Sequence, residues 1–245
     1  MARQAARQLA DRFARGMIAK ARYGYGDRPF REPVIRDMRD ESNELTAVLS
    51  RNSYGCLVLN TSRVMFVDVD IPQLESAVPG WLRKLTRKPA PESLVEQALG
   101  RADQWCRRTP GWGWRVYRTR AGLRLLATHG LFEPESEFTQ SAFDAVNADP
   151  LYRKLCQTQK CFRARVTPKP WRCDVGIPPV RWPFADGGAE ARFQSWVSSY
   201  EVAAKDRATC ELVTCIGNTA QHPGVQAIVR LHDELSRVGS GLQLA

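Results

Sequence analysis

The sequence lacks any apolar run long enough to cross a membrane, and residues 1–20 lack the apolar core of a secretory signal. Both absences predict a cytoplasmic protein without a membrane partner. The seven cysteines are an odd number, which does not suit a framework built only from disulfides. Reduced thiols are therefore expected, as in most cytoplasmic proteins.

Several widespread catalytic motifs are missing as well. The chain contains no Gly-x-x-x-x-Gly-Lys phosphate loop, no Gly-x-Gly-x-x-Gly dinucleotide motif and no Gly-x-Ser-x-Gly nucleophile turn. The three histidines, His129, His222 and His232, offer no catalytic triad, and each is expected to be a surface or capping residue. Any chemistry must therefore come from other side chains.

Positive charge is in excess. The chain has 36 Lys and Arg against 26 Asp and Glu, which gives a formal charge of +10. The excess is uneven, because residues 151–173 contain seven basic residues and no acid, whereas residues 131–150 contain five acids and no base. Such a charge favours a polyanionic partner, and nucleic acid is the simplest one.

Residues 64–72 form an apolar run that delivers two aspartates, Asp68 and Asp70. Its β-branched and aromatic residues predict a buried strand. Because side chains alternate between the faces of a strand, both carboxylates should point the same way. Carboxylates that repel each other suit a hard divalent cation, which prefers oxygen ligands. The run therefore predicts a metal site, and two solvated strand-end residues are the alternative.

The hydrophobic pattern predicts interleaved helices and strands. Two β-hairpins are expected, over residues 54–70 and 112–128. Helices are expected over residues 3–22, 36–49, 91–110, 131–150, 189–207 and 223–237. The predicted fold class is α/β (α+β), with a mainly antiparallel or mixed sheet and flanking helices. The expected organisation is an N-terminal helical flank over residues 1–50, a core over 51–188 and a C-terminal helical flank over 189–245.

Residues 161–173 combine four cations with two aromatic side chains and stiffening prolines. Arg163 and Arg165 would share one face if this part of the chain is extended. Guanidinium groups bind phosphate and aromatic rings stack on bases, so the segment suits a single-strand path or a nucleotide pocket. A basic surface loop with buried aromatics is the alternative. The residues expected to contact nucleic acid are Lys169, Trp171 and Arg172.

Cysteine spacing permits a second kind of metal site. One loose group contains Cys156, Cys161 and Cys173, and a second pair is Cys210 and Cys215. Spacers of four residues occur in zinc sites, although they are less diagnostic than two-residue spacers. Zn²⁺ is therefore a second candidate cofactor, and buried free thiols in the core are the alternative.

The order of these features resembles the archaeo-eukaryotic primase superfamily, which includes primase-polymerases. The first motif of that family is an acid-x-acid pair at a strand end, which Asp68 and Asp70 match. Its third motif is a single acid after the second hairpin, for which Asp149 is the candidate and Asp174 the rival. The resemblance implies that Asp68, Asp70 and Asp149 are catalytic and bind Mg²⁺ or Mn²⁺.

The second motif of the family follows a glycine-containing turn and ends in a histidine that contacts nucleotide phosphates. Here the chain has Gly122, Leu123 and then Arg124 at the position of that histidine. An arginine can grip phosphate bidentately but cannot replace a neutral imidazole. The residues expected to bind the nucleotide phosphates are Arg118, Arg124, Arg163 and Arg165.

The resemblance implies a primase-polymerase-like, divalent-metal-dependent nucleotidyltransferase whose catalytic core is residues 51–188. Its partners would be DNA or RNA and nucleoside triphosphates. Because the flanks are small, we expect either a minimal enzyme or one that works with a companion protein such as a helicase. Two alternatives stay open: a non-catalytic nucleic-acid-binding protein with a primase-like fold, which Arg124 favours, and a metal-dependent nuclease that uses the same carboxylates.

Overall fold

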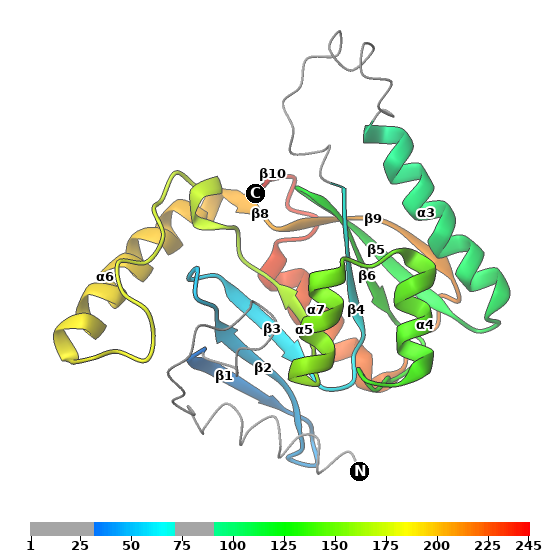
Figure 1. The fold of residues 1–245 in the computed structure, drawn as a ribbon, viewed down its shortest axis with the longest axis horizontal. Helices are drawn as coiled ribbons and strands as arrows, with labels where there is room; N and C mark the ends of the chain where they lie inside the picture. The colour runs from blue at the N-terminus through cyan, green and yellow to red at the C-terminus, as the bar shows by residue number, and fades with distance from the viewer. Residues whose placement is uncertain (1–31, 72–90) are drawn as a thin grey trace, which may run out of the picture.

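The computed structural model describes residues 32–71 and 91–245. In these ranges the chain forms two four-stranded antiparallel sheets, one short parallel strand pair and five α-helices (Figure 1). The predicted class of mixed α/β structure with mainly antiparallel sheets is confirmed. The predicted basic helix over residues 3–22 lies outside the described residues. No helix within the described ranges is long and apolar enough to span a membrane.

The two aspartates lie in the first sheet, which we call the carboxylate sheet. Its strand order is β4-β6-β5-β9. The strands are β4 (Phe66–Asp70), β6 (Gly122–Ala127), β5 (Gly113–Thr119) and β9 (Cys210–Gly217). Strands β5 and β6 form the second predicted hairpin, which is confirmed. Strand β9 belongs to the predicted helical flank, yet it pairs with β5 along seven residues and extends the carboxylate sheet.

The second sheet has the order β1-β2-β3-β7. Its strands are β1 (Val34–Arg39), β2 (Leu45–Arg51), β3 (Leu57–Thr61) and β7 (Phe162–Arg165). A separate parallel pair joins β8 (Arg207–Ala208) to β10 (Gln243–Leu244). Because β2 pairs with β3, the second sheet crosses the predicted domain boundary at residue 50.

The helix predicted over residues 36–49 is wrong, because β1 and β2 fill this range. The reason is the turn between them. The Asp40 carboxylate accepts hydrogen bonds from the backbone N–H groups of Ser42 and Glu44, at 3.0 and 2.9 Å. Asn43 takes a left-handed φ of 62°. Aspartate and asparagine stabilise such turns and interrupt a helix.

The first predicted hairpin is also wrong. Its two arms, β3 and β4, are consecutive in the chain but belong to different sheets. The chain changes sheet through residues 62–65, where the Thr61 hydroxyl donates to the Val64 carbonyl at 2.6 Å. As a result, β4 pairs with β6 of the second hairpin, and the aspartates lie opposite the motif that contains Gly122 and Arg124.

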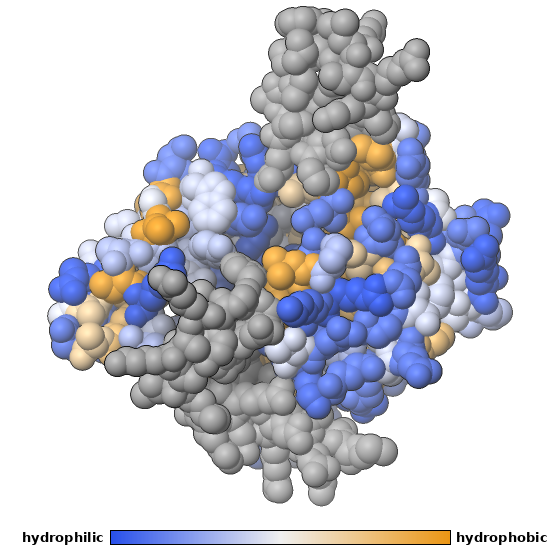
Figure 2. All heavy atoms as spheres, in the orientation of Figure 1, coloured by the Kyte–Doolittle hydropathy of each residue, from blue (hydrophilic) through white to orange (hydrophobic). Residues whose placement is uncertain are grey.

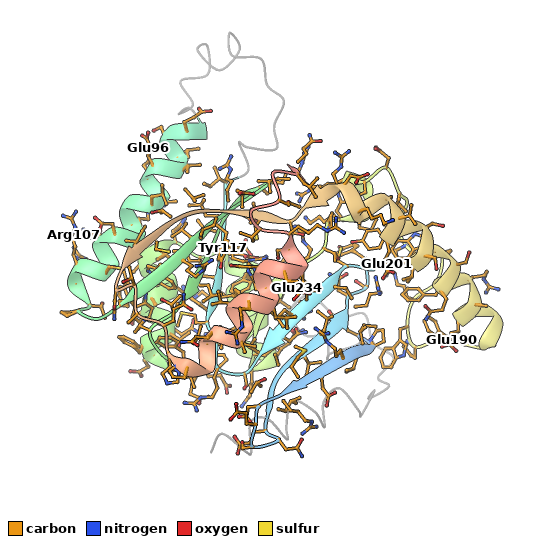
Figure 3. All side chains as sticks on the ribbon, turned by 180° about the vertical axis from the view of Figure 1, so that it is seen from behind. Glu96, Arg107, Tyr117, Glu190, Glu201 and Glu234 are labelled. Carbon is orange, nitrogen blue, oxygen red and sulfur yellow. The ribbon has the colours of Figure 1, made fainter. Side chains whose placement is uncertain are left out.

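The described residues form five α-helices, and the predictions for residues 91–110, 189–207 and 223–237 each match one of them. The helices are α3 (Pro91–Arg108), α4 (Glu137–Val146), α5 (Pro150–Gln159), α6 (Gly187–Ala203) and α7 (Pro223–Ser236). Helix α7 lies on one face of the carboxylate sheet, and α3 and α4 lie on the other (Figures 1 and 3). The outward faces of α4 and α5 are largely hydrophilic (Figure 2).

Candidate functional site

Asp68 and Asp70 lie on one face of β4 at its exposed end, as predicted. Val67 and Val69 alternate with them and are buried on the opposite face. In the pairing with β6, Asp68 lies opposite Arg124 and Asp70 lies opposite Gly122. The carboxylate face of β4 is therefore also the face that carries the Arg124 side chain.

Arg124 is bound to Asp68 and is almost fully buried, with 2% of its side chain exposed. Its Nε donates to Asp68 Oδ1 at 2.8 Å and its Nη2 to Asp68 Oδ2 at 3.3 Å. Its Nη1 donates to the backbone carbonyl of Arg165 at 2.8 Å. Since these contacts occupy the guanidinium and burial closes it to solvent, the predicted phosphate-binding role of Arg124 does not fit the structure. Arg124 instead orients one of the two candidate metal ligands.

A buried polar network continues from Arg124 to α7. The His232 side chain is fully buried, and its Nε2 lies 3.4 Å from Arg124 Nη1. Because an arginine can only donate, Nε2 must accept, which places the ring proton on Nδ1 facing Asp233 Oδ1 at 2.9 Å. Burial and then the Arg124 charge lower the pKa of His232, in keeping with a neutral ring. The network ends where Arg115 pairs with Asp233 at 2.6 Å.

The expectation that His232 is a surface or capping residue is therefore wrong, whereas His222 does cap α7. A sequence signal for the buried position was present. His232 follows Ile228 by four residues and Val229 by three, so helical spacing places it on the buried stripe of α7. Figure 3 shows α7 crossing the sheet beside Tyr117, whose ring packs on His232.

Asp149, the candidate third acid, lies beside β4. Its backbone N–H donates to the Asp68 carbonyl at 2.9 Å. Its carboxylate caps α5 by accepting from the Tyr152 N–H at 2.6 Å. The rival, Asp174, lies exposed in a left-handed backbone conformation beyond the short 3-10 helix η2 (Pro170–Arg172). Of the two acids, Asp149 is the one that the structure joins to Asp68.

The Asp70 carboxyl group is affected by the charges of the two other acids. Partial desolvation raises the pKa of Asp70, and the charges of Asp149 and then Asp68 raise it further. Lys169 and Arg172 act in the opposite direction and lower the pKa of the same carboxyl group. A cation placed among the acids would relieve their repulsion, so the donor set suits a divalent metal ion. Within residues 32–71 and 91–245, however, no three His, Cys, Asp or Glu side chains are already arranged as a metal cage.

Replacing Asp70 with asparagine is expected to stabilise the protein at neutral pH. A raised pKa means that the folded state holds this proton more tightly than the unfolded state. Wild-type stability therefore falls as the pH rises from the ordinary pKa of 3.8 through the raised pKa of the folded state. The stabilisation by Asp70→Asn should therefore be present at about pH 7 and disappear near about pH 3. Thermal unfolding at both pH values measures it.

Asp174→Asn is the matched control, because this acid is exposed and asparagine tolerates its left-handed backbone. Its melting temperature should stay at the wild-type value at both pH values. Equal melting of Asp70→Asn and wild type at neutral pH would contradict the desolvation and repulsion that raise the pKa of Asp70.

The other predicted phosphate ligands have different surroundings. Arg118 pairs with Leu123 across β5 and β6, on the sheet face opposite the carboxylates, so it is not part of this site. Arg163 is paired with Glu32 at 2.6 Å, and both side chains are 12% exposed. Arg165 is half-buried and donates to the Thr167 carbonyl at 2.7 Å, and no ion pair joins it to an acid in the described part of the chain. Of the four arginines, Arg165 best keeps the capacity to bind phosphate.

The predicted nucleic-acid contacts lie close to the carboxylates. Arg163 and Arg165 share a face of β7, as expected for an extended segment. The chain then turns through η2, which carries Trp171 and Arg172, with Lys169 immediately before it. Because Lys169 and Arg172 both influence the Asp70 carboxyl group, the basic segment borders the acidic site.

All seven cysteines are free thiols. Cys210 is buried beside His232, with its Sγ 3.8 Å from Nε2, whereas Cys215 on the same strand is exposed. Burial raises the pKa of Cys156. No group of three potential metal ligands that includes these thiols occurs among the described residues. The zinc prediction therefore gains no support from the geometry, and the buried thiols suit packing in the core.

Comparisons of the chain with protein-family models, with curated proteins and with solved structures gave no match. Its function must therefore be argued from the residues themselves.

Proposed function

We propose that the chain is a primase-polymerase-like, divalent-metal-dependent nucleotidyltransferase that acts on nucleic acid. The observation that carries the proposal is geometric: Asp68 and Asp70 share one face of β4, and the Asp149 backbone N–H donates to the Asp68 carbonyl at 2.9 Å. The charges of Lys169 and Arg172, which act on the Asp70 carboxyl group, support it. Acids that gather a divalent ion, bordered by cations that meet phosphate, are the components that phosphoryl transfer requires. The resemblance to the primase superfamily supports the same reading.

Each residue would contribute in a specific way. Asp70 is exposed at the strand end and Asp68 is 31% exposed, so both keep carboxylate lone pairs open to solvent. Arg124 would hold Asp68 in one orientation, as partners behind a metal ligand do. Arg165 would bind a phosphate, and Lys169 and Arg172 would hold the strand. Mg²⁺ or Mn²⁺, when bound by the acids, would neutralise charge on the transferring phosphoryl group.

The test is primer extension by the full chain with labelled nucleoside triphosphates, Mg²⁺ or Mn²⁺ and a primed single-stranded template. Asp70→Asn and Asp149→Asn remove a charge while keeping an oxygen acceptor, and asparagine also keeps the α5 cap. Each should lower extension about 100-fold or more, because loss of metal-centred charge stabilisation costs several kcal/mol. Asp174→Asn is the control and should retain wild-type extension.

A second candidate function is supported by the buried ion pair of Arg124 and Asp68. Because this pair occupies one candidate metal ligand, the chain would bind nucleic acid without catalysis, on a primase-like fold. This reading predicts that the wild type binds an oligonucleotide but neither extends nor cleaves it. Cleavage without extension would instead indicate the metal-dependent nuclease. If Asp70→Asn abolishes the extension or cleavage that the wild type performs, that reaction depends on the acids.

A further inference from the structure

Two aromatic side chains from distant parts of the sequence meet beside the basic segment. The ring of Trp171 meets the ring of Tyr54 at 83°, with centroids 5.4 Å apart. The Lys169 ammonium lies 5.5 Å from the centroid of the Trp171 ring. We call these three side chains the Tyr54–Trp171 platform. Tyr54 comes from the turn between β2 and β3. Because it lies far from Trp171 in the sequence, the sequence does not indicate that the two rings meet.

The Trp171 side chain is exposed to solvent, and hydrogen bonds fix the backbone that carries it. It is 48% exposed, although Pro170 before it and Cys173 just beyond it are buried. The backbone N–H of Cys173 donates to the Pro170 carbonyl at 2.8 Å, and that of Arg172 donates to the Lys169 carbonyl at 2.9 Å. A large aromatic side chain that is exposed on a fixed backbone is prepared to bind, since little conformational entropy is left to lose.

The Tyr54 side of the platform is equally constrained. The Asn52 side-chain oxygen accepts from the N–H groups of Tyr54 and Cys56, each at 3.0 Å. Gly55 has a φ of +86°, and a Cβ built there would lie 2.1 Å from the Trp196 ring. The turn is therefore fixed by hydrogen bonds on one side and by close packing on the other.

The surroundings of the platform indicate what it binds. Lys169 and Arg172 stand on either side of Trp171 in the sequence, and both act on the Asp70 carboxyl group. An aromatic ring flanked by cations matches a nucleotide, which offers a flat base and a phosphate. Bases in a duplex are already stacked on one another, whereas an unpaired base has a ring face to offer.

We infer that the Tyr54–Trp171 platform stacks an unpaired base of single-stranded nucleic acid, and that Lys169 meets the adjoining phosphate. The inference rests on the proposed function and specifies its substrate, because it makes a single strand the form of nucleic acid that reaches the carboxylates. The net charge of +10 favours this partner over a protein surface.

Fluorescence anisotropy of the full chain at low salt tests the inference. The probes are labelled oligo(dT) of about a dozen nucleotides and a labelled duplex of equal length. The wild type should prefer the single strand. Trp171→Ala should weaken single-strand binding about 5- to 150-fold, which is the range for one lost stacking contact, and should leave duplex binding unchanged. Trp171→Phe keeps a ring and should restore most of the affinity.

Phe138→Ala is the matched control, because Phe138 is 49% exposed but lies on α4 in a different aromatic cluster. It should bind oligo(dT) as the wild type does. Wild-type affinity in Trp171→Ala would overturn the platform and leave the proposed function standing, since extension is measured separately. A wild-type preference for duplex would overturn the single-strand specificity. Binding of neither probe would overturn both proposals and leave Trp171 as a contact for a protein partner.

Discussion

Replacing Arg124 with methionine is expected to lower the free energy of unfolding by about 3–5 kcal/mol. Methionine keeps an unbranched apolar stem but removes the charge and every donor. Three acceptors then lose their partner: the Asp68 carboxylate, the Arg165 carbonyl and His232 Nε2. Because Arg124 is 2% exposed and His232 is fully buried, water cannot replace the hydrogen bond to His232 Nε2, although it can reach the half-buried Asp68 carboxylate. Urea denaturation followed by circular dichroism measures the loss.

A second charged pair provides the control. Arg107 and Asp103 are 2.8 Å apart on the surface of α3, with side chains 79% and 45% exposed. Arg107→Met should change the free energy of unfolding by less than about 1 kcal/mol, because solvent already screens this pair. Similar losses for Arg124→Met and Arg107→Met would contradict the contribution assigned to the buried network.

A double-mutant cycle separates the ion pair from the rest of the network. Asp68→Asn alone leaves a buried cation without its counter-charge, so it is also expected to be strongly destabilising. The double variant, Asp68→Asn with Arg124→Met, should lose less than the sum of the two single changes, by about 0.5–3 kcal/mol. Additive losses would mean that Arg124 stabilises the fold through packing and His232, rather than through Asp68.

The local features of the site were predictable from the sequence. Alternation along a strand placed Asp68 and Asp70 on one face, and turn residues predicted the hairpin of β5 and β6. Both predictions depend on residues close together in the chain, where hydrophobic pattern and turn chemistry act directly. Asp149 is a candidate only through the resemblance, and a backbone hydrogen bond joins it to Asp68.

Pairing between distant segments was not predictable in the same way. The hydrophobic pattern identifies β4 as a buried strand but does not say which strand lies beside it. The pattern predicts pairing with β3, whereas the structure pairs β4 with β6. The pairing with β6 is what sets Arg124 opposite Asp68 and converts an expected phosphate ligand into the partner of a carboxylate. In the same way, Tyr54 meets Trp171 only because the fold joins segments far apart in the sequence.

Replacing Gly122 with alanine is expected to lower the free energy of unfolding by about 1–3 kcal/mol, the usual cost of overpacking a close contact. A Cβ built on Gly122 would lie 2.0 Å from the Val69 carbonyl oxygen and 3.1 Å from Asp70 Cα. Both neighbours are backbone atoms of β4, which cannot rotate away as a side chain can. The backbone of Gly122 does not need a positive φ, so the requirement for glycine here is one of space.

Gly100→Ala is the matched control, because a Cβ at this position of α3 meets nothing within 4 Å. Alanine there should raise stability by about 0.5–1 kcal/mol, since it favours the helix over glycine. Urea denaturation of the two variants should therefore give shifts of opposite sign. Equal shifts would show that β4 and β6 do not approach as closely as described.

The effect of Gly122→Ala should also reach the candidate site, because Gly122 lies opposite Asp70 and the adjoining Ala121 carbonyl accepts from the Ile71 N–H at 2.7 Å. A methyl group that displaces the end of β4 moves the Asp70 carboxylate away from Asp68 and Asp149. Mn²⁺ binding, followed by electron paramagnetic resonance, should then be weaker in Gly122→Ala than in Gly100→Ala. Unchanged Mn²⁺ affinity in a destabilised Gly122→Ala variant would show that Gly122 is needed only for the packing of β6 against β4. Binding of Mn²⁺ by the carboxylates would then tolerate movement of the strand that carries them.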